Sequence, residues 1–235
     1  MGDGSRDGPL EPLAVIRLAL TAVAAAALLA GCGGAGAGGH ATLWVTRDEG
    51  RTVLVDTTVP AGETALQALD RKTDITTRYG GKFVESVNGL AGSITNRRDW
   101  FYFVNGIEAP RGAQEYRLHD GDVLWWDYRD WGSSGVSVPV VVGAFPEPFV
   151  HGYDGKIRPA FVIGPHTPAV RSVARLLHAK QAAVAPQGAN VLEISRGTPT
   201  RFFAGPRGDA VLFTFVGDPR QLLDRAVYAH RYRLP

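Results

Sequence analysis

Residues 98–106 read Arg-Asp-Trp-Phe-Tyr-Phe-Val-Asn-Gly, an aromatic run that ends in an Asn-Gly pair. Asn-Gly favours a type I′ turn, because both central residues of that turn need a positive φ angle, and such turns join antiparallel strands. We therefore predict a strand over 99–104 that enters a hairpin. A second aromatic stretch, Val-Leu-Trp-Trp-Asp-Tyr at 123–128, follows a His-Asp-Gly-Asp turn and is predicted to be the last strand of the same region.

The segments before this hairpin predict further strands and one helix. Apolar and polar residues alternate over 41–47, a second strand is predicted over 52–59, and the Asp-Glu-Gly between them is typical of a hairpin turn. Pro-Ala-Gly at 60–62 ends the second strand, and 63–72 is rich in helix formers. A short strand is expected over 83–87, and a short strand or turn over 115–118.

The aromatic strands are apolar on both faces. Trp100 and Tyr102 lie on one side of their strand and Phe101 on the other, while Trp125 and Trp126 point in opposite directions. A sheet covered by a single helix should leave its other face polar. Three explanations are open: residues 138–235 cover the outer face, its aromatic rings form a platform for a ligand, or these rings are ordinary, partly exposed side chains. The candidate ligand-binding residues are Trp100, Tyr102, Trp125, Trp126 and Trp131.

The order of these motifs supports a family assignment. The series comprises Val-Pro-Ala-Gly-Glu-Thr-Ala-Leu-Gln-Ala-Leu at 59–69, Val-Asn-Gly at 87–89, the aromatic run at 100–106, and Leu-His-Asp-Gly-Asp-Val-Leu-Trp-Trp at 118–126. It resembles the bacterial family related to the C-terminal domain of transcobalamin and intrinsic factor. That resemblance covers residues 41–131 and implies a β-grasp domain of the soluble-ligand-binding group.

The resemblance implies a binding module rather than an enzyme, and cobalamin is a ligand by resemblance only. In the vitamin carriers this domain supplies one wall of the cobalamin site, and a large helical barrel supplies the other. This chain shows no long helical repeats, which separates it from those carriers. No cofactor is assigned on other grounds.

Residues 138–235 predict a second, smaller α+β domain, joined to the first by the linker Gly-Ser-Ser-Gly at 132–135. The fold class is therefore α+β, a β-grasp domain followed by this domain, for which we identify no family. A helix is expected over 169–183, and Asp218-Pro219 is typical of the start of another, with Leu222, Leu223, Ala226 and Val227 facing the sheet. Strands are expected over 136–144, 157–163, 191–194, 201–204 and 210–216.

Composition and motif spacing argue against several functions. The histidines lack the spacing of metal ligands, and Ser195 lacks the glycine-flanked turn of a hydrolase nucleophile, so neither a metal site nor an enzyme is expected. The chain carries 25 Lys and Arg against 23 Asp and Glu. With no dominant basic field, nucleic acid is not expected as a partner.

The first 32 residues predict export. An apolar run over 18–29 is too short, at about 1.5 Å per residue, to cross a hydrocarbon core of about 30 Å. It ends in Leu-Ala-Gly-Cys at 29–32, which resembles a bacterial lipobox. That resemblance implies cleavage before Cys32, a diacylglyceryl group on its thiol, and a membrane anchor completed by further acylation, for example by palmitate. The alternative is an ordinary secretory signal followed by an unmodified cysteine.

Residues 33–40, mostly Gly and Ala, are expected to form a flexible tether to the folded part. We therefore expect an extracytoplasmic lipoprotein, anchored to the cell membrane, that binds a cobalamin-like or other small ligand and delivers it to a membrane transporter. The alternative is a structural or protein-interaction lipoprotein of the cell envelope that has no small-molecule ligand.

Overall fold

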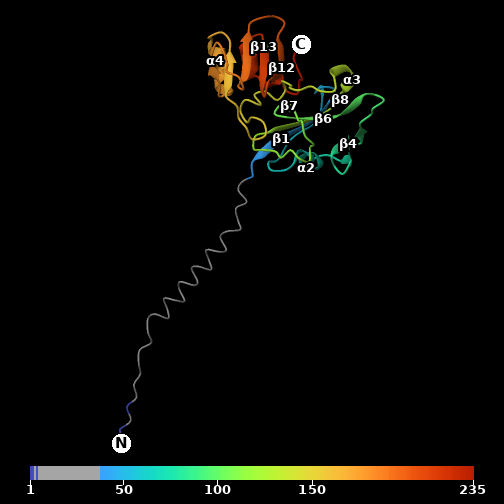
Figure 1. The fold of residues 1–235 in the computed structure, drawn as a ribbon, viewed down its shortest axis with the longest axis vertical. Coiled ribbons are helices and arrows are strands. Elements are labelled where there is room, and N and C mark those ends of the chain that lie inside the picture. The colour runs from blue at the N-terminus through green and yellow to red at the C-terminus, as the bar shows by residue number, and fades with distance from the viewer. Residues whose placement is uncertain (3, 5–37) are drawn as a thin grey trace. The chain divides into compact units, whose positions relative to one another are not determined.

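The computed structural model describes residues 1, 2, 4 and 38–235, and Gly38–Pro235 form one compact unit (Figure 1). Most of the predicted signal peptide, the predicted lipidation site Cys32 and most of the tether lie outside the described residues, and these assignments stay predictions. Among the residues that are described, no helix is long and apolar enough to span a bilayer. The fold is α+β, with more strand than helix.

The first sheet is a mixed sheet of five strands in the order β2-β1-β8-β6-β7. Its central strands β1 and β8 run parallel, and every other neighbouring pair is antiparallel. All of the strands predicted over 41–47, 52–59, 83–87, 99–104 and 123–128 are confirmed. The sheet comprises β1 (His40–Arg47), β2 (Thr52–Pro60), β6 (Arg98–Val104), β7 (Ile107–Glu108) and β8 (Val123–Asp130).

A short helix and a small sheet accompany this first sheet. The helix α2 (Ala65–Asp70) is shorter than the predicted 63–72, and it begins at a capping box in which Thr64 and Gln67 exchange hydrogen bonds. Its buried Ala65, Ala68 and Leu69 pack against the sheet. The small sheet has the order β3-β4-β5, with strands β3 (Ile75–Arg78), β4 (Phe83–Val87) and β5 (Leu90–Ala91).

The Asn-Gly hairpin forms as its sequence predicts. Asn105 has a φ of 52° and Gly106 a φ of 76°, the positive values that a type I′ turn requires. Asn105 is fully buried, and its side chain bonds Asp122, the Gly152 carbonyl and the backbone N–H of Val123. A β-carbon on Gly106 would lie 2.7 Å from the Val141 carbonyl oxygen. The turn therefore fixes the first sheet against the chain that follows it.

The second sheet has five strands in the order β10-β9-β11-β13-β12, and only β12 runs antiparallel to its neighbour. Figure 1 shows the helix α4 (Pro168–Leu176) beside this sheet, and α2 beside the first one. The strands of the second sheet are β9 (Ala160–Ile163), β10 (Lys180–Gln181), β11 (Asn190–Ser195), β12 (Arg201–Arg207) and β13 (Ala210–Val216).

Three predictions for this region were wrong in detail. Residues 136–144 do not form a strand and make a single bridge, between Val140 and Ile107, before the chain turns at 143–149. The predicted helix over 169–183 ends at Leu176, because His178 takes a φ of 52° and the following residues pair with β9 as β10. The strand predicted from 157 begins only at Ala160.

The last segment also differs from the prediction. Asp218 caps the backbone N–H of Arg220 and Pro219 begins a helix, as predicted, but the helix is a short 3-10 turn, η1 (Pro219–Leu223), followed by η2 (Arg225–Val227). Leu222 is buried, whereas Leu223 is 47% exposed because the tighter turn directs it to solvent. Leu223 therefore does not face the sheet.

The outer face of the first sheet is covered by the chain beyond residue 138. Trp44, Phe103 and Trp125 are buried together with Val141, Ala144 and Tyr232. This covering accounts for the apolar residues that the sequence places on both faces of the aromatic strands. The predicted boundary between a domain at 41–131 and another at 138–235 stays a prediction, since Gly38–Pro235 is compact as a whole.

Candidate functional site

The opposite, helix-covered side of the aromatic strands holds a pocket of about 390 Å³, which we call the aromatic pocket. Trp100, Tyr102 and Trp126 line it from β6 and β8. Two segments close it, residues 81–84 before and within β4 and residues 108–113, which run from the last residue of β7 into the following loop. The pocket thus lies at the edge of the core that α2 completes, where β6 is covered by loops instead of the helix.

Tyr102 and Trp126 form the stacked centre of this pocket. They stand opposite each other in the β6–β8 ladder, with ring centroids 4.9 Å apart and ring planes inclined by 23°. The Tyr102 hydroxyl donates a 2.6 Å hydrogen bond to the Arg111 carbonyl oxygen, which fastens the 108–113 loop to the strand. Burial raises the pKa of Tyr102, so this phenol stays protonated and keeps donating.

Trp126 carries a polar atom that the fold does not satisfy. Its side chain is 3% exposed, and its indole N–H has no hydrogen-bond partner among the described residues. The neighbouring Trp100 differs, because its indole N–H donates to the Leu90 carbonyl oxygen at 2.8 Å. Buried donors in proteins are normally paired, and an unpaired one costs about 1–3 kcal/mol. A ligand acceptor that reaches Trp126 would remove that cost.

Charged groups of both signs surround the mouth of the aromatic pocket. Lys82 is exposed, and the partly buried Asp99 has a pKa that desolvation raises above the ordinary aspartate value. Arg111 is held by an ion pair of 2.5 Å to Asp154 and lies over the Tyr116 ring. Phe83 is 48% exposed at the same rim. The mouth can therefore orient a ligand that combines an apolar body with polar substituents.

The structure places Trp125 and Trp131 away from this pocket. Trp125 has no exposed surface, and its indole N–H donates to Thr46 Oγ1 at 2.7 Å beneath the covering segment. Trp131 begins the short helix α3 (Trp131–Ser134), where its backbone N–H bonds the Arg97 carbonyl. The structure therefore gathers Trp100, Tyr102 and Trp126 into one pocket and does not bring the other two candidates to it.

Sequence reasoning missed the loop walls of the pocket. Phe83 and the stretch Ala109–Ala113 supply them, and the only signal in that stretch is the turn chemistry of Pro110 and Gly112. Loop residues lack the apolar periodicity from which strands and helices are predicted. Only the fold shows that Tyr102 holds this loop over the rings.

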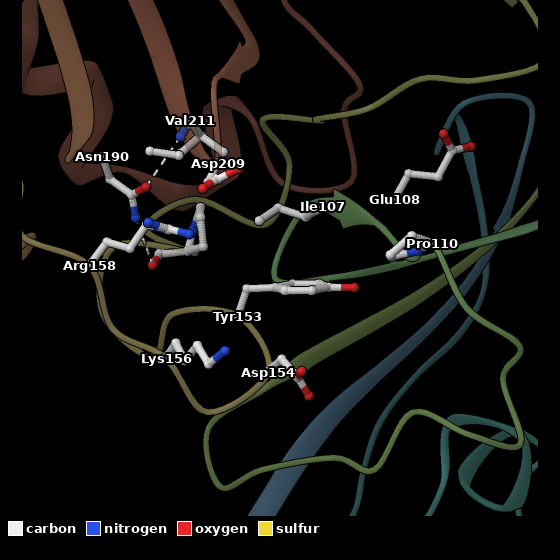
Figure 2. Close-up of a pocket in the computed structure, with 12 residues that line it drawn as sticks. Ile107, Glu108, Pro110, Tyr153, Asp154, Lys156, Arg158, Asn190, Asp209 and Val211 are labelled. Carbon is white, nitrogen blue, oxygen red and sulfur yellow. Dashed lines mark hydrogen bonds between the residues drawn. The ribbon is translucent and has the colours of Figure 1, made fainter. Parts of the chain in front are cut away.

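A second pocket of about 360 Å³ lies between the two sheets and shares Glu108 and Pro110 with the aromatic pocket. Figure 2 shows Tyr153 at its centre, with Lys156 on the same loop and Arg158 beyond it. The Tyr153 hydroxyl has no partner among the described residues, and burial raises its pKa to about 12.

Asn190 fixes the far wall of this second pocket. Its side chain accepts from the Val211 N–H at 3.2 Å and donates to the Pro148 carbonyl at 3.4 Å (Figure 2). The wall therefore joins β11, the start of β13 and the loop at 148. Across the described residues, no three His, Cys, Asp or Glu side chains gather as metal ligands would.

Comparison with known proteins gives a match for part of the chain. Residues 62–130 match a family model described as a domain of unknown function (DUF4430). This segment contains α2, the aromatic strands and the loop walls of the aromatic pocket. No curated protein sequence matches the chain.

Two solved structures share a limited likeness with the chain. Haptocorrin in complex with Cbi is 17% identical with a TM-score of 0.32, and the match covers 38% of this chain and 25% of haptocorrin. A protein from Ruminococcus gnavus ATCC 29149, provisionally named as metal binding, is 16% identical with a TM-score of 0.33, over 39% of this chain and 97% of its own. The chain thus spans a quarter of the length of haptocorrin.

Proposed function

We propose that this chain is a binding protein whose aromatic pocket takes a small ligand with a flat apolar part and a hydrogen-bond acceptor. The stacked Tyr102–Trp126 pair with its unpartnered indole N–H carries this proposal. Rigid rings offer a large contact area at low entropic cost, and a single buried donor can fix the orientation of a ligand. The Tyr102 hydrogen bond to the 108–113 loop supports a pocket that is formed before the ligand arrives.

We propose a β-grasp fold for the first sheet and its helix. The parallel pairing of β1 with β8 at the centre of the sheet, and the packing of α2 on one face, support that assignment. A transcobalamin-like identity and cobalamin as the ligand rest on the order of sequence motifs alone. Cobalamin is for this reason the first compound to test.

The cellular setting belongs to the same proposal. Cys32 carries the lipid, residues 33–40 form the tether, and the folded part works outside the cytoplasm, where it hands its ligand to a membrane transporter. The Leu-Ala-Gly-Cys sequence at 29–32 supports the anchor. We propose that the chain has no enzymatic activity.

A structural or protein-interaction role is the second candidate, and one observation favours it. Trp44 and Trp125 are closed off beneath Val141, Ala144 and Tyr232, so these two tryptophans serve the packing of the first sheet against the segments that cover it. In that case the aromatic strands as a whole are structural, and the unpartnered Trp126 N–H has no ligand.

Titration of the full-length chain with cobalamin separates the two candidates. Tryptophan fluorescence and the melting temperature should both respond, and Ala109→Phe should weaken binding at least about tenfold because the added ring fills the pocket. Ala183→Phe, at an exposed alanine outside the aromatic pocket, is the matched control and should bind as the wild type does. The absence of both responses in the wild type, or equal affinity of both variants, would count against ligand binding in this pocket.

A further inference from the structure

Four arginines gather where the end of the first sheet meets the C-terminal residues, and we call them the arginine face: Arg51, Arg201, Arg231 and Arg233. They line two adjoining hollows of about 600 and 490 Å³, which share Glu49, Tyr232, Arg233 and the two residues after it. The four come from different parts of the chain, namely the β1–β2 turn, β12 and the C-terminal segment. The fold therefore brings these four positive charges together, although no single stretch of the sequence contains all of them.

The side chains of the arginine face are exposed and uncompensated. None of the four makes an ion pair or a side-chain hydrogen bond to any residue that the structure describes, whereas arginines elsewhere, such as Arg71, Arg78 and Arg111, each pair with a carboxylate. Among the described residues that line the two hollows, Glu49 is the only one with an acidic side chain. Four cations against two anions, the Glu49 carboxylate and the carboxylate of the last residue, Pro235, form a local excess on a chain whose net charge is only +2.

We propose that the arginine face binds a phosphate-rich anionic polymer of the cell envelope. Planar guanidinium groups present paired N–H donors that match phosphate oxygens, and like charges held together lose their mutual repulsion when anions lie between them. Two adjoining hollows can bind several phosphates of one polymer chain. The exposed Phe203, next to the exposed Arg201 on the edge strand β12, adds an apolar contact for the backbone of such a polymer.

The position of the arginine face favours a polymer over the lipid bilayer as its binding partner. This inference rests on the lipid anchor that is part of the proposed function. The compact unit begins at Gly38, just before β1, and Glu49 and Arg51 follow the other end of that strand. At about 3.3 Å per residue β1 spans about 23 Å. Residues 33–39 reach at most about 25 Å when fully extended. Laying the face on the bilayer would thus stretch the tether almost straight, at a cost in chain entropy.

Calorimetric titration of the full-length chain with sodium polyphosphate, at low and at physiological salt, tests this proposal. We expect binding that weakens as salt rises, because charges on the surface are screened. The double variant Arg231→Gln/Arg233→Gln should bind at least about tenfold more weakly at low salt. The control Arg171→Gln/Arg175→Gln removes the same charge from α4, which lines neither hollow, and should stay within about twofold of the wild type.

Three outcomes would overturn the proposal. Equal weakening by the two double variants would show that net charge alone attracts the polymer. No heat of binding with polyphosphate at low salt would rule out the polymer as the ligand of the arginine face. Binding to phosphatidylglycerol vesicles instead, lost in Arg231→Gln/Arg233→Gln, would identify the bilayer as the partner. Cobalamin titrations of the same variants keep this result separate from the aromatic pocket, because neither double variant changes a residue that lines it.

Discussion

The Tyr232 hydroxyl donates a 3.0 Å hydrogen bond to Asp127 Oδ2, joining the C-terminal segment to the middle of β8 across 105 positions of the chain. Asp127 is fully buried and also accepts from the hydroxyl of Thr46 and the backbone N–H groups of Glu49 and Gly50. This carboxylate therefore ties the first sheet to the C-terminal segment, at the end of β1 where the arginine face lies.

Loss of the Tyr232 hydroxyl should weaken this junction. Tyr232→Phe removes one of four donors to a buried carboxylate, and we expect a loss of about 1.5–3 kcal/mol in the free energy of unfolding. Tyr228→Phe is the matched control, because its hydroxyl donates to the neutral Leu222 carbonyl at 3.2 Å, so its loss should be only about 0.5–1.5 kcal/mol. Urea unfolding measures both. Equal losses of unfolding free energy in the two variants would show that the hydrogen bond from Tyr232 to Asp127 stabilises the fold no more than the one from Tyr228 to a neutral carbonyl.

Asp127 should also make stability depend on pH. Desolvation raises its pKa above the ordinary aspartate value despite the hydrogen bonds that it accepts. The folded state then holds the proton more tightly than the unfolded chain, so this contribution is full below about pH 3.9 and is lost as pH rises through the folded pKa.

The variant Asp127→Asn removes this titration. The stability of the wild type relative to the variant should fall as the pH is raised from about 4, and should become constant once Asp127 is ionised in the folded state. Unfolding free energies of both proteins between about pH 3 and pH 8 test this. A relative stability that rises with pH would show that the hydrogen bonds outweigh the desolvation of Asp127.

Arg129 should be far more sensitive to substitution than Arg98. Its side chain has no exposed surface, lies 3.7 Å from the Phe101 ring centre, and bonds Glu108 and the Val136 carbonyl. Arg129→Lys keeps the charge but loses the planar fork, and should cost about 2–4 kcal/mol. Arg98→Lys, at a partly exposed ion pair with Asp48, should cost less than about 1 kcal/mol. Thermal unfolding that ranks the two in the opposite order would refute this.

Much of the first sheet could be predicted from the sequence, because its strands carry local signals. Asn105-Gly106 specifies a turn through backbone sterics, and the aromatic alternation specifies two faces, one of which the structure shows covered by Val141 and Tyr232. The helix over 169–183 was overextended because helix formers continue past Leu176, and the pairing of β10 with β9, which ends it, is a long-range contact.

The site was predictable only in part. Trp100, Tyr102 and Trp126 stood out as aromatic residues on strands, but the sequence does not show that the face carrying Trp125 is the closed one, because its cover depends on the distant Tyr232. The loop walls of the pocket and the arginine face are made by residues far apart in the chain, so neither has a local pattern.

The anchor prediction concerns residues outside those that the structure describes. In a bacterial host fed with radiolabelled palmitate, the wild type should carry label and sediment with membranes, because the lipid attaches at Cys32. Cys32→Ala should carry none and should leave the membrane fraction. Label that persists in Cys32→Ala would rule out Cys32 as the site, since the chain has no other cysteine.

The five tryptophan indole N–H signals in a ¹H–¹⁵N spectrum test ligand binding in the aromatic pocket most directly. The Trp44, Trp100 and Trp125 N–H groups already bond Asp56, Leu90 and Thr46, whereas the Trp126 N–H has no partner among the described residues. When cobalamin is added to the full-length chain, we predict that the Trp126 signal, assigned by its loss in Trp126→Phe, moves furthest and the Trp44 and Trp125 signals hardly move. Saturable shifts that leave Trp126 in place, or no shift at all, would contradict ligand binding at this pocket.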